Sequence, residues 1–253
     1  MRNLNPRNLT RRSRWLVAAG VTAGATAVAV VAGLLFLDSG SGPDKARALT
    51  ADEANRLAIT RFRNYESGGR SVRITVPDVA GGLVVTASVD FRAKLAYGVI
   101  RGEGRNSSSD GLVQWSPTVV SVAPLADAPD QAPVTPPTTG WSSRPLQANG
   151  SALDSALRIA LGLGNDRPDN AQLLPQNGAS WLGQETLNGH EVVRMSGPGA
   201  RDRPDTKDTV HYWIGTDGTM YRVQVTVASD PQPVVIDFDT QPFTPVKPIP
   251  HAG

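Results

Sequence analysis

The fold class of this chain is decided by the stretch at residues 83–92, LVVTASVDFR. Every second residue from Leu83 to Phe91 is apolar, and the positions between them are polar from Thr86 onward. Because successive side chains of a strand point to opposite faces, this alternation predicts a β-strand with one buried face. The Gly81-Gly82 pair supplies the turn before it.

The same period of two recurs along the chain. It is found at residues 72–76, 97–99, 112–115, 118–123, 183–187, 191–196, 210–214, 221–227 and 234–238. Asn188-Gly189 and Asp217-Gly218 are hairpin turns between such runs. Alternating strands joined by short turns predict an antiparallel meander with one apolar and one polar face.

Two amphipathic helices are predicted as covers for the apolar face. Thr50 and Glu53 fit a capping box at the start of the first, residues 51–64. Ser151 is the N-cap expected for the second, residues 152–163. Since the apolar face of an antiparallel sheet must be covered, the fold class predicted is α+β.

A charge-free apolar run at residues 15–37 precedes this domain. About 20 such residues are needed for a helix to cross a bilayer. Five arginines and no acidic residue stand in residues 1–14, and flanking positive charge stays on the cytoplasmic side. We therefore expect a cytoplasmic basic tail (1–14), a single transmembrane helix (15–37), a linker (38–49) and an extracellular domain (50–250) at the cell membrane.

A cleaved signal peptide is the alternative interpretation of this segment. Ala27-Val28-Ala29 has the small-x-small form of a cleavage site. The apolar run continues beyond it to Leu37, which favours an uncleaved signal anchor. Because the chain contains no Cys, attachment of lipid to a lipobox cysteine is excluded.

Composition narrows the classes of partner. The net charge of the chain is +2, but the five arginines of residues 1–14 leave the remainder with a charge of −3. No nucleic-acid partner is expected for such a domain. Residues 124–150 contain six prolines and little apolar periodicity, which predicts an irregular surface insert between two halves of the domain.

The sequence predicts no enzyme, no metal and no cofactor. His190, His211 and His251 are scattered, whereas a zinc site needs clustered ligands. Neither a G-x-S-x-G elbow nor a Walker loop is present. An enzyme stays a third hypothesis, which would require an acid or base with a perturbed pKa in a cleft.

Two hypotheses for function depend on whether the helices seal the sheet. An incomplete seal would leave an apolar cavity for a lipid or other apolar ligand. Assigned from alternation and helical spacing, its lining is predicted to be Val72, Ile74, Val85, Val89, Leu157, Leu161, Tyr212, Val223 and Val225. A complete seal would instead favour an envelope sensor or protein-interaction module, with a protein partner at an edge strand or at the Pro-rich insert.

The order of motifs in the C-terminal part resembles a known family. WLGQETLNG (181–189), HYWIGTDG (211–218), RVQV (222–225), IDFD (236–239) and PVKP (245–248) follow one another. This order resembles the C-terminal half of the LppX/LprG lipoproteins of the LolA-like superfamily, over roughly residues 180–250. The chain also resembles a group of uncharacterised membrane-anchored proteins from high-GC Gram-positive bacteria.

The resemblance implies a β half-barrel with helices packed on its concave face, and the handling of lipid or lipoproteins outside the membrane. It implies no catalytic residues. Two features depart from the family, namely the missing acylated Cys and the insert at 124–150. The same fold serves as a sensor module in envelope-stress regulators, so fold alone does not fix function.

Overall fold

The computed structural model describes residues 45–78, 81–104, 109–147, 151–199, 209–227 and 232–250. Residues 43–253 form one compact unit of the chain. The predicted basic tail and transmembrane segment, residues 1–37, lie outside the described residues. Within the described ranges, no helix has the length and apolar character needed to span a bilayer.

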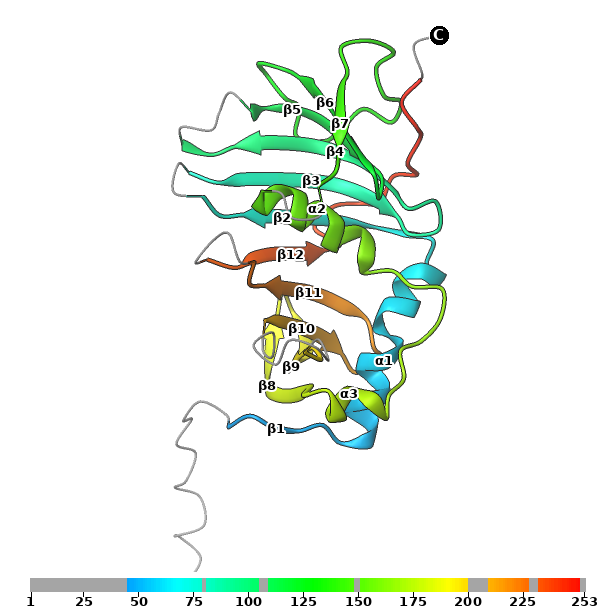
Figure 1. Ribbon diagram of the computed structural model, residues 1–253, viewed down its shortest axis with the longest axis vertical. Coiled ribbons are helices and arrows are strands. Elements are labelled where there is room, and N and C mark those ends of the chain that lie inside the picture. Colours follow the sequence, from blue (N-terminus) through cyan, green and yellow to red (C-terminus); the bar gives the residue numbers. More distant parts are fainter. Residues whose placement is uncertain are drawn as a thin grey trace, which may run out of the picture. The chain divides into compact units, whose positions relative to one another are not determined.

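The described strands form one antiparallel sheet of twelve strands (Figure 1). Across the sheet they are β1 (Arg47–Ala48), β8 (Ser180–Leu187), β9 (His190–Ser196), β10 (Val210–Gly215), β11 (Met220–Val225), β12 (Val234–Phe238), β2 (Gly69–Val76), β3 (Leu83–Asp90), β4 (Leu95–Gly102), β5 (Gly111–Trp115), β6 (Val119–Pro124) and β7 (Ser142–Pro145). The pairing of β12 with β2 joins the C-terminal half to the N-terminal half. The predicted antiparallel architecture is confirmed.

The register places the alternating apolar residues in continuous rows. Ile74 lies opposite Val85 on one side and Ile236 on the other, and Ile236 in turn lies opposite Val223. Because paired residues point to the same face, this row runs across four strands on one side of the sheet. We call this side the helix-covered face and the opposite side the outer face.

Three helices pack against the helix-covered face (Figure 1). They are α1 (Ala51–Glu66), α2 (Ala152–Gly162) and the short α3 (Leu173–Gln176). Helix α2 contacts β2, β3 and β12, whereas α1 contacts β2, β10, β11 and α3. Two apolar clusters result, a large one under α2 and a smaller one between α1, α3 and strands β9 and β10.

The predicted capping box at the start of α1 is present. The Glu53 amide donates to Thr50 Oγ1 at 3.3 Å, and the Thr50 amide donates to Glu53 Oε2 at 2.8 Å. The Arg47 guanidinium donates to both oxygens of Glu53 at 2.8 Å. These contacts, above all the hydrogen bonds from Arg47, lower the pKa of the Glu53 carboxyl from 4.5 to about 2.

We expect Glu53→Gln to lower the free energy of unfolding at pH 7 by about 1 kcal/mol, since one partner, Arg47, is solvent-exposed. The folded pKa lies below the ordinary value, so the carboxylate stabilises the fold fully above pH 4.5. The stabilisation by the Glu53 carboxylate, and with it the difference between the two proteins, is lost as the pH falls from 4.5 towards 2. Urea unfolding of both proteins between pH 7 and pH 3 measures it, and a difference independent of pH would contradict the assignment.

The outer face is less polar than the alternation predicts. Tyr97, Val99, Leu112 and Ala123 form a third apolar cluster there, covered by Ala128, Ala132, Trp141 and Val246. The C-terminal residues are held across this face because Gln114 bonds to the Lys247 carbonyl and the Ile249 amide, both at 2.9 Å. Burial raises the pKa of Tyr97 to about 12. The prediction of a wholly polar outer face was therefore wrong at β4–β6.

Two strands lie in segments predicted to be irregular. Strand β1 occupies the end of the predicted linker 38–49 and pairs with β8. Strand β7 lies within the insert 124–150 and pairs with β6. Both are exposed along their whole length, so no apolar alternation marks them in the sequence. The linker and the insert each contribute an edge to the sheet.

Candidate functional site

The predicted lining residues come together in the structure. Eight of them, Val72, Ile74, Val85, Val89, Leu157, Leu161, Val223 and Val225, are buried in the cluster under α2. The ninth, Tyr212, is half-buried and packs against both apolar clusters. The sequence pattern thus predicted a connected apolar group of side chains.

Helix α2 carries two of these eight residues, Leu157 and Leu161, and fills the space next to the other six. Leu157 is fully buried, and its carbonyl accepts a hydrogen bond of 2.9 Å from the indole N–H of Trp115 on β5. The Arg144 guanidinium bonds to both oxygens of Asp154, at 2.8 and 2.6 Å, and so ties the start of α2 to β7. The helix is therefore fixed to the sheet by packing and by polar contacts at two points.

An opening remains where the two apolar clusters meet. This α1–β10 pocket has a volume of about 180 Å³ and is lined by Leu57, Thr60, Arg61, Asp169, Leu174, Gly197, Pro198, Val210 and Tyr212. Of the nine predicted lining residues, Tyr212 alone lines it. Its walls come from α1, the α2–α3 connection, α3 and strand β10 with the segment after β9.

An ion pair stands at this pocket. Arg61 Nε donates to Asp169 Oδ2 at 3.0 Å and Nη2 donates to Oδ1 at 2.5 Å, which is a bidentate arrangement. This pairing raises the pKa of Arg61 above its ordinary value. Burial raises the pKa of Tyr212 above its ordinary 10.0, so its phenol is uncharged at neutral pH. The net charge of the lining is zero.

Thr60 is the unusual member of the pocket. It is 1% exposed, yet its Oγ1 has no hydrogen-bond partner among the described residues. Buried hydroxyls are nearly always paired, so an unpaired one requires an explanation. The signal was available in the sequence, because Thr60 follows Leu57 at helical spacing on the buried side of α1. Asp169 could not be foreseen, because 108 residues separate it from Arg61.

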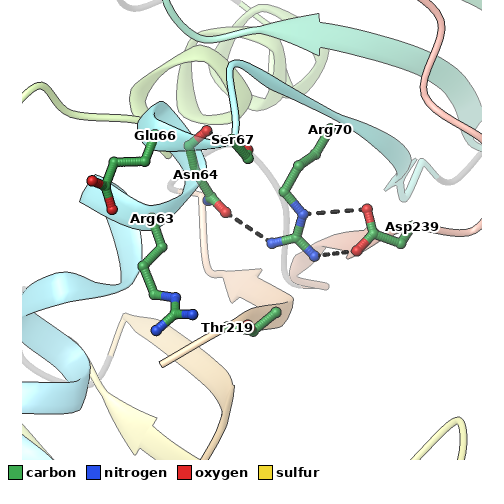
Figure 2. A pocket seen from close by; sticks show the side chains of 7 residues that line it. All are labelled: Arg63, Asn64, Glu66, Ser67, Arg70, Thr219 and Asp239. Carbon is green, nitrogen blue, oxygen red and sulfur yellow. Dashed lines mark hydrogen bonds and ion pairs between the residues drawn. The ribbon is translucent and has the colours of Figure 1, made fainter. Parts of the chain in front are cut away.

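A larger and more polar pocket lies at the end of α1 (Figure 2). This Arg70 pocket has a volume of about 430 Å³ and is lined by Arg63, Asn64, Glu66, Ser67, Arg70, Thr219 and Asp239. Figure 2 shows the guanidinium of Arg70 between the carboxylate of Asp239 and the amide of Asn64.

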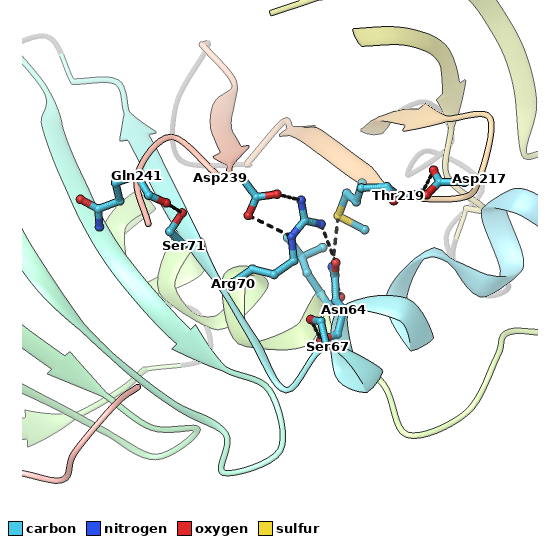
Figure 3. Close-up of polar contacts among 10 residues, drawn as sticks. Asn64, Ser67, Arg70, Ser71, Asp217, Thr219, Asp239 and Gln241 are labelled. Carbon is cyan, nitrogen blue, oxygen red and sulfur yellow. Dashed lines mark hydrogen bonds and ion pairs between the residues drawn. The ribbon is translucent and has the colours of Figure 1, made fainter. Parts of the chain in front are cut away.

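The buried polar groups of the Arg70 pocket satisfy one another (Figure 3). Arg70 donates to Asn64 Oδ1 at 2.8 Å and to Asp239 Oδ1 at 3.2 Å, and its guanidinium lies 4.4 Å from the ring centre of Phe238. Asn64 also donates to the Leu163 carbonyl at 2.8 Å. The network therefore connects α1 and β2 with the ends of α2 and β12. We assign it the structural role of holding these elements together. Sequence analysis did not predict it.

The described residues hold no group of three or more His, Cys, Asp or Glu side chains able to bind a metal ion. His190 stacks on Tyr221 with ring centres 4.3 Å apart, and His211 lies beside Trp213 with centres 6.3 Å apart. The two imidazoles lie on different strands, His190 on β9 and His211 on β10, and each packs against an aromatic ring.

No family model and no curated protein matches the chain. A solved DUF1329 family protein from Desulfovibrio piger is 12% identical, with 74% of this chain and 90% of that chain covered and a TM-score of 0.30. A domain assigned as an outer membrane lipoprotein-sorting protein from Vibrio parahaemolyticus is 8% identical, with coverages of 75% and 91% and a TM-score of 0.25.

Both TM-scores lie below 0.5, so neither likeness decides the fold or the function of this chain. The described residues themselves form one antiparallel sheet with three helices on one face.

Proposed function

We propose that the chain is a non-enzymatic, single-pass membrane protein whose extracellular, LolA-like domain binds a lipid or other apolar ligand on the helix-covered face. The α1–β10 pocket carries this proposal. It opens between two apolar clusters and is walled largely by aliphatic and aromatic side chains. Removing apolar area from water, at about 25 cal/mol per Å², would supply the binding free energy.

The anchor in this proposal is the apolar run at residues 15–37, with the arginines of residues 1–14 on the cytoplasmic side. Such an anchor would keep the domain next to the lipids that it binds. Whether the segment is cleaved is tested by the mass of the mature chain: loss of the residues up to Ala29 would overturn the anchor.

Native mass spectrometry tests the ligand. Residues 43–253, purified without detergent, are expected to carry extra mass that solvent extraction releases as lipid. Val210→Trp fills the pocket and is expected to reduce that mass several-fold. Val119→Trp, on an exposed position of β6, is the matched control and should keep the ligand. Ligand that persists in Val210→Trp would place it elsewhere.

A closed-core interaction module is the second candidate. The observation that favours it is the packing of α2, with its own Leu157 and Leu161, on the six predicted lining residues that lie on strands. Its partner would add a strand at β7, whose four residues are all exposed at the edge of the sheet. A clean apo mass with a cooperative, high melting transition would favour this candidate over ligand binding.

A further inference from the structure

We propose that the ligand of the α1–β10 pocket is a neutral, single-chain amphiphile whose polar group, an ester, amide or hydroxyl, hydrogen-bonds to Thr60 Oγ1. This inference rests on the proposed function and adds the chemistry of the ligand to it. Three observations lead to it: the unpaired hydroxyl of Thr60, the charge balance of the lining, and the size of the pocket.

The hydroxyl of Thr60 defines the polar end of the ligand. Threonine in a helix commonly bonds to the carbonyl three or four residues earlier. Thr60 Oγ1 makes no such bond, although the residue is 1% exposed and lines the pocket. A hydroxyl both donates and accepts, so an ester or amide carbonyl can accept from it and a ligand hydroxyl can donate to it.

The charges of the lining favour a neutral polar group. Arg61 and Asp169 pair with each other in two hydrogen bonds and leave no net charge at the pocket. An anionic ligand would have to displace Asp169 from Arg61 or lie beside its carboxylate, and a cationic ligand would meet Arg61. Since a charge loses hydration in this partly apolar pocket, a neutral group is the better match.

The volume limits the apolar part. Sites for drug-sized ligands measure about 300–1,000 Å³. At about 180 Å³, the α1–β10 pocket admits one acyl chain or part of one. The aliphatic side chains of Leu57, Leu174 and Val210 provide its apolar contacts.

Photolabelling of the full chain in phosphatidylcholine nanodiscs tests the inference. Three photoreactive probes share one chain length: a monoacylglycerol, the corresponding fatty acid at pH 8, and an alkane without a polar group. The monoacylglycerol is expected to label peptides of α1, α3 and β10. The extent of this labelling should be several-fold higher than the labelling by the fatty acid. Thr60→Val should reduce this labelling by about two- to tenfold, the value of one hydrogen bond, and Thr60→Ser should retain it.

Two controls separate the loss of a hydrogen bond from the loss of the fold. Labelling by the alkane should be unchanged in Thr60→Val, which shows that the pocket is intact. Thr75→Val makes the same substitution on the outer face of β2 and should change none of the three labels.

The outcomes distinguish the inference from the proposed function. Equal labelling by monoacylglycerol and fatty acid, or monoacylglycerol labelling unaffected in Thr60→Val, overturns the neutral amphiphile and leaves apolar binding standing. Absence of any probe from the peptides of α1, α3 and β10 overturns both.

Discussion

Val223→Asp is expected to unfold the domain formed by residues 43–253. Val223 is fully buried on β11, in register with Ile236 of β12 and Tyr212 of β10. An aspartate at this position must bury an unpaired carboxylate or be protonated, and either alternative costs about 4 kcal/mol or more. Domains of this kind are stable by about 5–15 kcal/mol, so most of that stability would be lost. Urea unfolding followed by circular dichroism measures the loss.

Gln224→Asp is the matched control for this prediction. Gln224 is the next residue of the same strand, so its side chain points to the outer face, where it is half-buried beside His211 and Val235. The same carboxylate there is expected to change the free energy of unfolding by less than about 1 kcal/mol. If Gln224→Asp proves the more damaging substitution, the register of β11 is wrong by one residue.

The sequence was most informative where one face of a strand is buried. The buried faces of β3 and β11 could be predicted because Val85, Ala87 and Val89, and likewise Val223 and Val225, are apolar at every second position, and the capping box of α1 is a local motif. Strands β1 and β7 escaped prediction because all their residues are exposed, so their sequences show no alternation of apolar side chains. Apolar and polar residues alternate only where one face of a strand is buried, so a fully exposed strand cannot be predicted from alternation.

The pockets could not be predicted for a different reason. The Arg61–Asp169 pair spans 108 residues, and the Arg70–Asp239 pair spans 169. Such pairs form only after the sheet has brought distant segments together, and neither pattern nor propensity encodes them. The apolar residues under α2 could be predicted because hydrophobicity is periodic, whereas Thr60 is one polar residue on an otherwise ordinary helix face.

Trp115→Ala is expected to lower the free energy of unfolding by about 3–5 kcal/mol. Trp115 is 1% exposed and is among the largest fully buried side chains of the core. Its ring packs in the cluster under α2, and its indole N–H bonds to the Leu157 carbonyl at 2.9 Å. Removing the ring leaves a cavity beneath the helix, so hydrogen exchange should accelerate more in α2 than in α1, which packs in the other cluster.

Trp115→Phe separates the packing of the ring from its hydrogen bond. Phenylalanine retains most of the buried apolar surface but cannot donate to the Leu157 carbonyl, so we expect a loss of about 1 kcal/mol from the missing bond plus a small cavity cost. If Trp115→Phe costs as much as Trp115→Ala, the hydrogen bond rather than the ring volume fixes α2. A helix held by polar contacts alone, from Trp115 and Arg144, would be free to lift from the sheet, and the six predicted lining residues on the strands beneath it would then become available to a ligand.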